Sequence, residues 1–184
     1  MANTSATGGP LTPAGTPAPA QDKDLDAIIQ TLIKGVSGLP GNMVRPAWQG
    51  VVPKQPASDQ DWCAFHISGI RADANPWIGH NGQGDGSDEY VRHEDIDVLC
   101  TFYGPNAMRN ASLARDGIYV TQNSEGITSH DMAVVGSTDL TAVPEFVNQQ
   151  WIRRYDLPIR LRRKVSRAYP VLNILSVPTN IVID

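Results

Sequence analysis

Apolar residues recur with the period of an α-helix near the start of the chain. Between residues 25 and 36 they fall at i, i+3, i+4, i+7, i+8 and i+11, which is one stripe of a helix of 3.6 residues per turn. The stripe consists of Leu25, Ile28, Ile29, Leu32, Ile33 and Val36. Asp22 or Asp24 is a candidate N-cap, and Gly35 and Gly38 indicate the helix end. We therefore predict a helix that packs this stripe on a core.

Two segments further along the chain have the pattern of β-strands. Residues 61–73 are rich in aromatic and β-branched side chains, and residues 94–104 alternate clearly. In the second segment the side chains expected on the buried face are Ile96, Val98, Cys100 and Phe102. Residues 75–90, with four glycines, have no period and are predicted to be the loop at the tip of a hairpin.

A second helix is expected after Gly104, because Pro105 suits the first turn of a helix. Its apolar stripe is narrow and consists of Ala107, Met108, Ala111, Ala114 and Ile118. Such small residues would let the helix lie close to a sheet. Residues 132–135 are predicted to form a short strand, and residues 144–151 a linker or a brief helix.

The C-terminal part alternates again. Tyr155, Leu157, Ile159 and Leu161 are separated by polar or basic residues, which predicts a half-buried strand with a basic outer face. Residues 165–168 would connect it to a second strand at 169–178. The order helix, hairpin, helix, short strand and hairpin predicts an α+β fold with a mainly antiparallel β-sheet packed by two helices.

The first residues cannot supply a packed face. Residues 2–20 are mostly Pro, Ala, Gly and Thr, so we expect a flexible N-terminal tail at 1–21 followed by one domain at 22–184. Neither a signal-peptide h-region nor an apolar run of membrane-spanning length is found in the sequence, so a soluble protein is expected.

Charge is distributed unevenly along the chain. The formal net charge is −4, yet the last 34 residues hold seven basic and two acidic groups, leaving eight basic and 17 acidic groups in the first 150. The seven basic residues are the candidate interface set: Arg153, Arg154, Arg160, Arg162, Arg163, Lys164 and Arg167. This asymmetry favours a surface that meets a charged partner.

Three interpretations of the basic strand remain open at this point. It could contact nucleic acid through phosphate groups, although the strand has no interleaved aromatic residues for base stacking. It could meet the acidic surface of another subunit, which fits the opposite charges of the two parts of the chain. It could also be a solvated edge strand on which charge blocks unwanted pairing.

A catalytic interpretation rests on one cluster. His93, Glu94, Asp95 and Asp97 place an imidazole near three carboxylates, as a metal-dependent nuclease would require. Asp95 and Asp97 share a strand face from which Glu94 points away, so a solvated strand end is the alternative. Cys63 and Cys100 lack zinc-site spacing and are expected to be buried thiols. No metal, cofactor or catalytic residue is predicted.

Several stretches resemble one protein family. The segment "DIDVLCTFYGPNAMRNASLARDGI" is similar to the strand–Tyr-Gly-Pro-x-Ala–helix element of the neck or tail terminator proteins of bacteriophages. "WIRRYDLPIRLRRKV" followed by "YPVLNILSV" resembles their C-terminal strands, and "VRPAWQ" before "DWCAFHISGI" also suits them. The matching family-motif positions are Tyr103, Gly104, Pro105, Ala107 and Trp151. The resemblance covers roughly residues 24–178 and leaves the Pro/Ala-rich start unexplained.

The resemblance implies a structural virion protein, not an enzyme. Such terminators form a ring, usually a homohexamer, that caps the tail tube and joins the tail to the neck. Implied partners are further copies of the chain, the tail tube protein and the sheath, the head-completion proteins of the neck, and the genomic DNA that passes through the lumen. The implied location is the tail–neck junction of the virion, after assembly in the host cytoplasm, without contact with a membrane.

Overall fold

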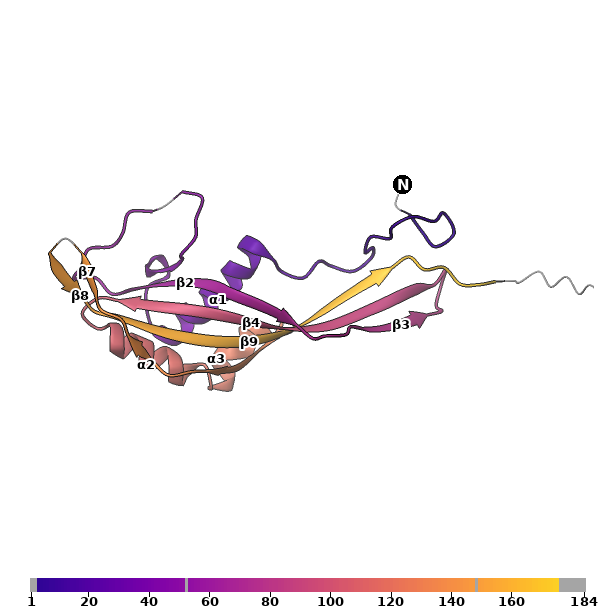
Figure 1. The fold of residues 1–184 in the computed structure, drawn as a ribbon. Helices are drawn as coiled ribbons and strands as arrows, with labels where there is room; N and C mark the ends of the chain where they lie inside the picture. The colour runs from indigo at the N-terminus through magenta and orange to yellow at the C-terminus, as the bar shows by residue number, and fades with distance from the viewer. Residues whose placement is uncertain (1–2, 52, 148, 176–184) are drawn as a thin grey trace, which may run out of the picture. The chain divides into compact units, whose positions relative to one another are not determined.

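The computed structural model describes residues 3–51, 53–147 and 149–175 (Figure 1). The chain divides into two compact units. The first consists of the described residues within 1–18, 74–92 and 165–184, and the second of those within 19–73 and 93–164. Two long strands, β4 (Ser87–Tyr103) and β9 (Arg154–Tyr169), contribute residues to both units.

The predicted first helix is α1 (Asp22–Ser37), in the second unit. Its stripe is buried as expected, with Ile28 partly buried at its margin. The cap prediction was wrong, because neither Asp22 nor Asp24 makes a capping side-chain hydrogen bond to the described residues. Gly38 ends the helix in the left-handed region, with φ of 71°, a conformation that glycine adopts without a steric penalty.

The predicted second helix is α2 (Ala107–Gly117). Its three alanines are fully buried, whereas Met108, expected in the same stripe, is exposed. A Cβ placed on Gly117 would lie 3.2 Å from Cβ of Val36, so α2 lies close to α1. The sequence analysis missed a third helix, α3 (Thr121–Thr128), because Ile127 is the one buried residue of this short segment.

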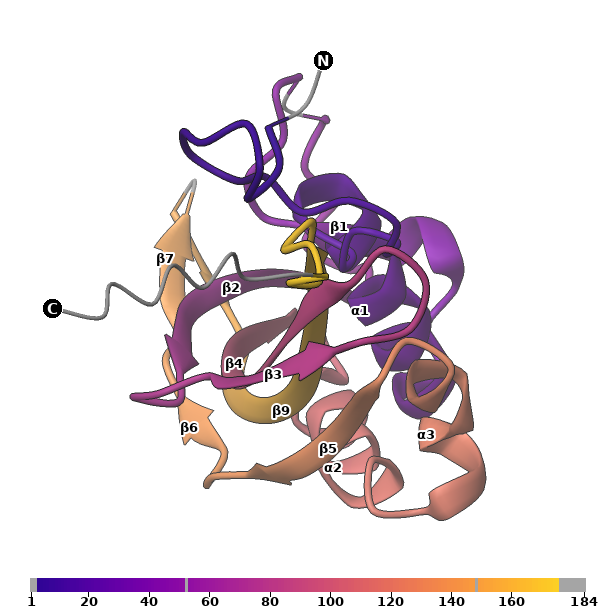
Figure 2. The same cartoon turned by 90° about the vertical axis from the view of Figure 1, so that its right-hand side faces the viewer.

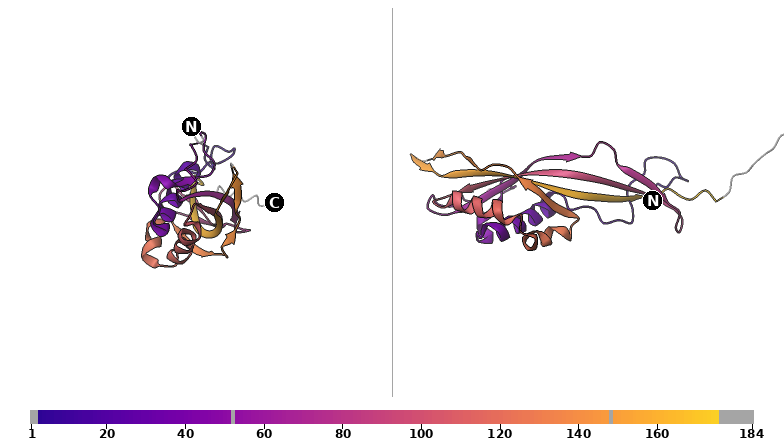
Figure 3. Two further views of the ribbon diagram at one scale, coloured as in Figure 1. Left: turned by 90° about the vertical axis from the view of Figure 1, so that its left-hand side faces the viewer. Right: turned by 90° about the horizontal axis from the view of Figure 1, so that it is seen from below.

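One face of a sheet supports these helices in the second unit. The strand order of the sheet is β1-β2-β4-β9-β5, with β6 also paired to β9. The strands with bounds not yet given are β1 (Val44–Pro46), β2 (Trp62–Ala72), β5 (Met132–Ser137) and β6 (Thr141–Ala142). All the strand pairs with a known register are antiparallel except β1 with β2. The predicted α+β class with a mainly antiparallel sheet is confirmed, with α1, α2 and α3 on one face of the sheet (Figures 2 and 3).

The buried face of the sheet follows the predicted alternation. Ile96, Val98, Cys100 and Phe102 of β4 are all at most 2% exposed, and Cys100 is paired with Phe65 of β2. The burial of a large apolar side chain stabilises a fold by about 1.5–3 kcal/mol. The alternate residues of β4 therefore lie on the opposite face, where the polar groups of the strand collect.

In the first unit, strand β3 (Trp77–Asn81) pairs with the start of β4, from Trp77 opposite Val91 to Asn81 opposite Ser87. Residues 75–90 are therefore a hairpin with a strand of its own, not only a loop. The N-terminal segment runs beside the end of β9, because the N–H groups of Ser5 and Ala14 donate hydrogen bonds to the carbonyls of Pro170 and Ala168.

Two further predictions need correction. Strand β9 continues to Tyr169, so residues 165–168 are strand and not a connection, and residues 170–175 form no strand. The strand ends before Pro170, because proline has no N–H to donate to a neighbouring strand. Residues 176–178 of the predicted second strand lie outside the described residues. Within residues 144–151, predicted to be a linker or a brief helix, residues 145–147 and 150–151 belong instead to a two-stranded sheet, β7 (Glu145–Val147) with β8 (Gln150–Ile152).

Candidate functional site

Alternation along β9 separates its apolar residues from its arginines. Leu157, Ile159 and Leu161 are buried against the helices, while Arg160 is exposed and Arg162 half-buried. The sequence analysis expected the heads of these two arginines to point away from the core, and they do. They lie over the polar face of β4, which neighbours β9 in the sheet.

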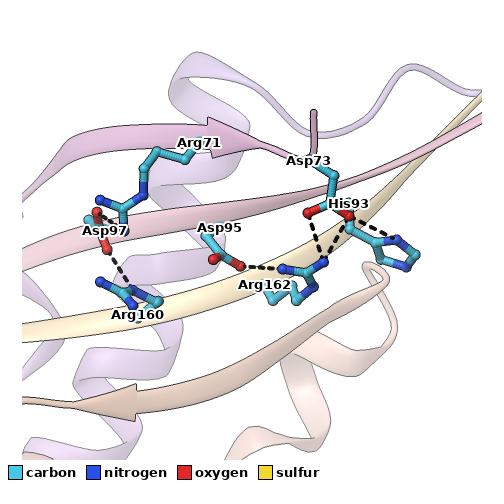
Figure 4. A network of polar contacts seen from close by, with 7 residues as sticks. All are labelled: Arg71, Asp73, His93, Asp95, Asp97, Arg160 and Arg162. Carbon is cyan, nitrogen blue, oxygen red and sulfur yellow. Dashed lines mark hydrogen bonds and ion pairs between the residues drawn. The ribbon is translucent and has the colours of Figure 1, made fainter. Parts of the chain in front are cut away.

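Each of these arginines meets carboxylates of the same chain (Figure 4). Nε of Arg160 donates a hydrogen bond of 3.0 Å to Asp97, whose other oxygen lies 2.9 Å from Arg71 of β2. Arg162 donates to Asp95 at 2.9 Å and to both oxygens of Asp73. We call these six side chains the ion-pair ladder: Arg71, Asp73, Asp95, Asp97, Arg160 and Arg162.

The ladder changes the interpretation of the basic strand. Three arginines face three aspartates, so the formal charges of the ladder cancel. Hydrogen bonds to Asp95 and then Asp73 raise the pKa of Arg162, as expected for a guanidinium between two carboxylates. Exposed pairs of this kind contribute about 0–1 kcal/mol each, and here they also favour one register of three strands.

Arg163 differs from the outward basic residue that was expected. Its side chain is only 5% exposed, and it donates to Glu94 at 2.8 Å and to the carbonyl of Ala20 at 2.6 Å. Because β9 alternates, Arg163 points to the helix side of the sheet, where Glu94 also points. A buried guanidinium requires such a partner, so this residue belongs to the folded core.

Arg154 forms a second local cluster. It donates two hydrogen bonds to Asp156, at 2.9 and 2.8 Å, and one to Glu145 of β7, and its guanidinium lies over the ring of Tyr103. The hydrogen bond to Asp156 is the main cause of a raised pKa for Arg154. The cluster holds the β7–β8 sheet against β9.

Three members of the basic set remain. Arg153 and Lys164 are exposed and Arg167 is half-buried. In the described ranges no carboxylate forms an ion pair with any of them. Arg153 does donate a weak hydrogen bond of 3.4 Å to the carbonyl of Pro105.

The carboxylates of the nuclease hypothesis are engaged by arginines. Asp95 and Asp97 bond to Arg162 and Arg160, and Glu94 points to the opposite face toward Arg163, as the alternation predicted. Nδ1 of His93 lies 3.9 Å from Asp73. Among the residues that the structure describes, no three His, Cys, Asp or Glu side chains are grouped so that they could hold a metal ion.

The Tyr-Gly-Pro-x-Ala segment forms the corner between β4 and α2. Tyr103 stacks on Trp62 at 4.4 Å, and Gly104 has φ of 109° with no room for a Cβ against the carbonyl of Gln60. Asp61 accepts hydrogen bonds from the backbone N–H and the side-chain amide of Asn106, both at 2.8 Å. The motif therefore encodes a tight turn that places the fully buried Ala107 in the core.

Two exposed aromatic residues of the β7–β8 sheet were not grouped by the sequence analysis. Phe146 and Trp151 are 61% and 71% exposed and face each other at 5.1 Å. The signal was available, because two short runs of β-favouring residues on either side of three polar residues are typical of a hairpin. We call β7 and β8 together, residues 145–147 and 150–152, the aromatic hairpin.

A surface pocket lies at the start of α1, also in the second unit. It has a volume of about 500 Å³, and its walls come from α1, β1, β2 and the residues after β1. Trp48, 73% exposed, forms one wall and packs on His66 at 4.6 Å. We call it the α1–β1 pocket; it includes Asp22, Leu25, Asp26, Trp48, Phe65 and Ile70.

These features are typical of a protein that acts by contacting other proteins, because exposed aromatic residues on a well-ordered domain commonly mark interaction sites. A comparison with protein families agrees. A sequence model described as phage neck terminator protein matches residues 23–184. The chain therefore belongs to the phage neck terminator protein family, which gives it a structural role in the neck and tail of a bacteriophage.

A comparison with curated proteins found no match. No described helix is long and apolar enough to cross a lipid bilayer.

Proposed function

We propose that the protein is the subunit of a ring, of six copies, that caps the tail tube and joins the tail to the neck. The observation that carries this proposal is the family match over residues 23–184. A closed ring requires that one face of a subunit bind a different face of the next. The exposed aromatic groups of the second unit, together with the exposed Arg153 and Lys164, are suitable for such contacts.

The proposed partners follow from this position in the virion. The ring would contact the tail tube protein on one side and the head-completion proteins of the neck on the other, with the sheath outside and the genomic DNA in its lumen. The ion-pair ladder suits a surface past which DNA moves, because its balanced charges would not hold phosphate groups.

Only some of the seven basic residues remain candidates for a contact with a partner. Arg154, Arg160, Arg162 and Arg163 already have carboxylate partners in their own chain, so their charge is not free for another subunit. Arg153, Lys164 and Arg167 remain candidates for contacts with a partner. A change of Arg160 or Arg162 to glutamate would place a carboxylate beside the aspartates of the ladder. Such a variant would therefore test the stability of the sheet as well as assembly.

The experiment combines the purified chain with its tail tube protein. Mass photometry and negative-stain images should show rings of the protein alone or bound at one end of the tubes. Tubes polymerised with the protein present should be shorter than tubes without it. A chain that neither forms rings nor binds tube ends would overturn the proposal.

A further inference from the structure

The aromatic hairpin has the properties of an element that inserts into a partner. It exposes Phe146 and Trp151 at 61% and 71%, and an exposed pair of large aromatic rings is costly to leave in water. Arg154 fixes it through Glu145 and Asp156. The ion pair with Glu145 restrains the base of this hairpin, which reduces the entropy that the base loses on binding and so favours affinity.

The α1–β1 pocket is a suitable receptor for an exposed aromatic side chain of this kind. Its walls combine apolar side chains, among them Leu25, Phe65 and Ile70, with the indole of Trp48. Arg163 also lines the pocket, but its charge is neutralised by Glu94. Gln21, Asp22, Asp26 and His66 also line the pocket, so an aromatic side chain entering it would meet apolar and polar groups together.

Charges at the two places are complementary. Asp22 and Asp26 line the pocket, and neither forms an ion pair with a described residue. Partial burial, followed by the nearby charge of Asp22, raises the pKa of Asp26. Arg153 directly follows the aromatic hairpin, is exposed and has no carboxylate partner in the described ranges.

The hairpin cannot reach the pocket of its own chain. It adjoins β9 at Arg154, whereas the pocket borders the same strand at Arg163. Nine residues of strand separate these points, which at about 3.3 Å per residue is on the order of 30 Å. Any contact between hairpin and pocket therefore joins two copies of the chain.

We propose that the aromatic hairpin of one subunit docks into the α1–β1 pocket of the next, with Trp151 in the pocket and Arg153 against Asp22 and Asp26. This inference rests on the proposed ring, and it identifies the elements through which one subunit of that ring binds the next. The contact is head-to-tail, because each subunit uses the hairpin at one end of the second unit and the pocket at the other. Repetition of such a contact gives a closed ring or an open helix.

The first test compares the self-association of single variants. Trp151→Ala and Arg153→Glu should each weaken association about 30-fold or more in sedimentation analysis, because buried Trp and Arg are the usual hot spots of interfaces. Asp26→Lys should do the same and keep its fold, since the carboxylate that it replaces is partly buried beside another. Arg109→Glu is the matched control, an exposed arginine of α2 outside the contact, and should associate like the parent chain.

The second test restores the contact. A chain with both Arg153→Glu and Asp26→Lys has the charges exchanged and should recover most of the association lost by either change. A double variant that remains as weak as the single ones would overturn the pairing, as would rings of normal stability in the single variants. Rings of normal stability in the single variants would agree with the proposed ring and contradict only this subunit contact.

A mixing experiment separates the contact from ring closure. One variant lacks a working hairpin (Trp151→Ala, Arg153→Glu) and the other a working pocket (Asp22→Lys, Asp26→Lys). The mixture should give a 1:1 complex that grows no further, because one intact contact remains. This complex together with open filaments of the parent chain would support the contact and overturn the closed ring; no complex at any soluble concentration would overturn the contact.

Discussion

Successive arginines of one strand have opposite physical roles. Arg160 and Arg162 lie on the solvent side of β9 in the ion-pair ladder, and Arg163 lies on the core side with Glu94. The difference follows from the period of two along a strand, which turns neighbouring side chains to opposite faces. Charge counted along the sequence does not distinguish them, although their energies should differ severalfold.

We expect Arg163→Met to destabilise the fold by about 3 kcal/mol, because it leaves Glu94 without its cation at a largely buried site. Arg160→Gln, the control on the other face, should cost about 0–1 kcal/mol because its pair is exposed. Urea unfolding followed by circular dichroism measures both. Equal effects for the two variants would contradict the assignment of Arg163 to the core.

Gly104 is the glycine of the family motif for which no other residue is suitable. A Cβ there would lie 2.5 Å from the carbonyl oxygen of Gln60, and φ is 109°. Gly104→Ala should therefore lower the free energy of unfolding by about 1–3 kcal/mol. Gly126→Ala, in α3 with open space around it, should be neutral or stabilising by about 0.5–1 kcal/mol; a similar loss in both variants would refute this account of the corner.

Among the larger elements, the β3–β4 hairpin of the first unit contacts Asn173, in the segment after β9, through several hydrogen bonds, one of which involves a histidine. Nδ1 of His80 lies 2.7 Å from Asp88, and Nε2 lies 2.9 Å from Oδ1 of Asn173. The amide nitrogen of Asn173 donates to the carbonyls of Gly82 and Gly84, so its oxygen is the atom that faces His80. Both ring nitrogens thus face oxygen acceptors, and only the imidazolium donates to both.

The attachment of Asn173 should therefore weaken as the pH rises. The hydrogen bond to Asp88, followed by that to Asn173, raises the pKa of His80 above its ordinary value of 6.5. A raised pKa in the folded state means that the stabilisation is complete below pH 6.5 and is lost as the pH passes through the folded pKa. Asp88 is the charged side chain that bonds to the ring, and Glu89 beside it bonds to Asn81.

Amide exchange of Asn173 measures this effect, because its N–H donates to the carbonyl of Asp85. In the parent chain, the protection of this amide, corrected for the pH dependence of the intrinsic exchange rate, should fall over the pH range in which His80 loses its proton. The His80→Gln variant should show no such step, since its amide does not titrate. A pH-independent protection in the parent chain would contradict the role of the imidazolium.

For the whole molecule, the ladder accounts for much of the charge asymmetry of the sequence. The acidic residues of β4, with Asp73 just after β2, meet the basic residues of β9 in the folded chain, so the opposite charges of the two parts largely satisfy each other. This arrangement also bears on the catalytic alternative, because a carboxylate bound to a guanidinium is a poor ligand for a divalent cation.

We expect no hydrolysis of DNA or RNA by the protein with Mg²⁺, Mn²⁺ or Zn²⁺. Asp95 and Asp97 would have to leave Arg162 and Arg160 before binding a metal ion. A gel assay on linear and circular DNA and on RNA, with the Asp95→Ala, Asp97→Ala double variant beside the parent chain, measures this. Cleavage by the parent chain that the double variant lacks would overturn the structural role.

Local periodicity by itself determined much of this protein. The stripe of α1, the buried face of β4 and the outward heads of Arg160 and Arg162 each depend on residues within a few positions of one another, so their signals survive in the sequence. The resemblance of the Tyr-Gly-Pro-x-Ala element and the C-terminal strand likewise indicated the family that the comparison shows.

Tertiary structure decided what each charge meets. The pairs of Arg162 with Asp95 and of Arg163 with Glu94 join residues 67 and 69 positions apart, and they depend on β9 lying beside β4 in one register. No short-range pattern encodes that register, because it results from packing of the whole core. For the same reason the α1–β1 pocket, whose walls come from elements far apart in the sequence, could be recognised only in the folded chain.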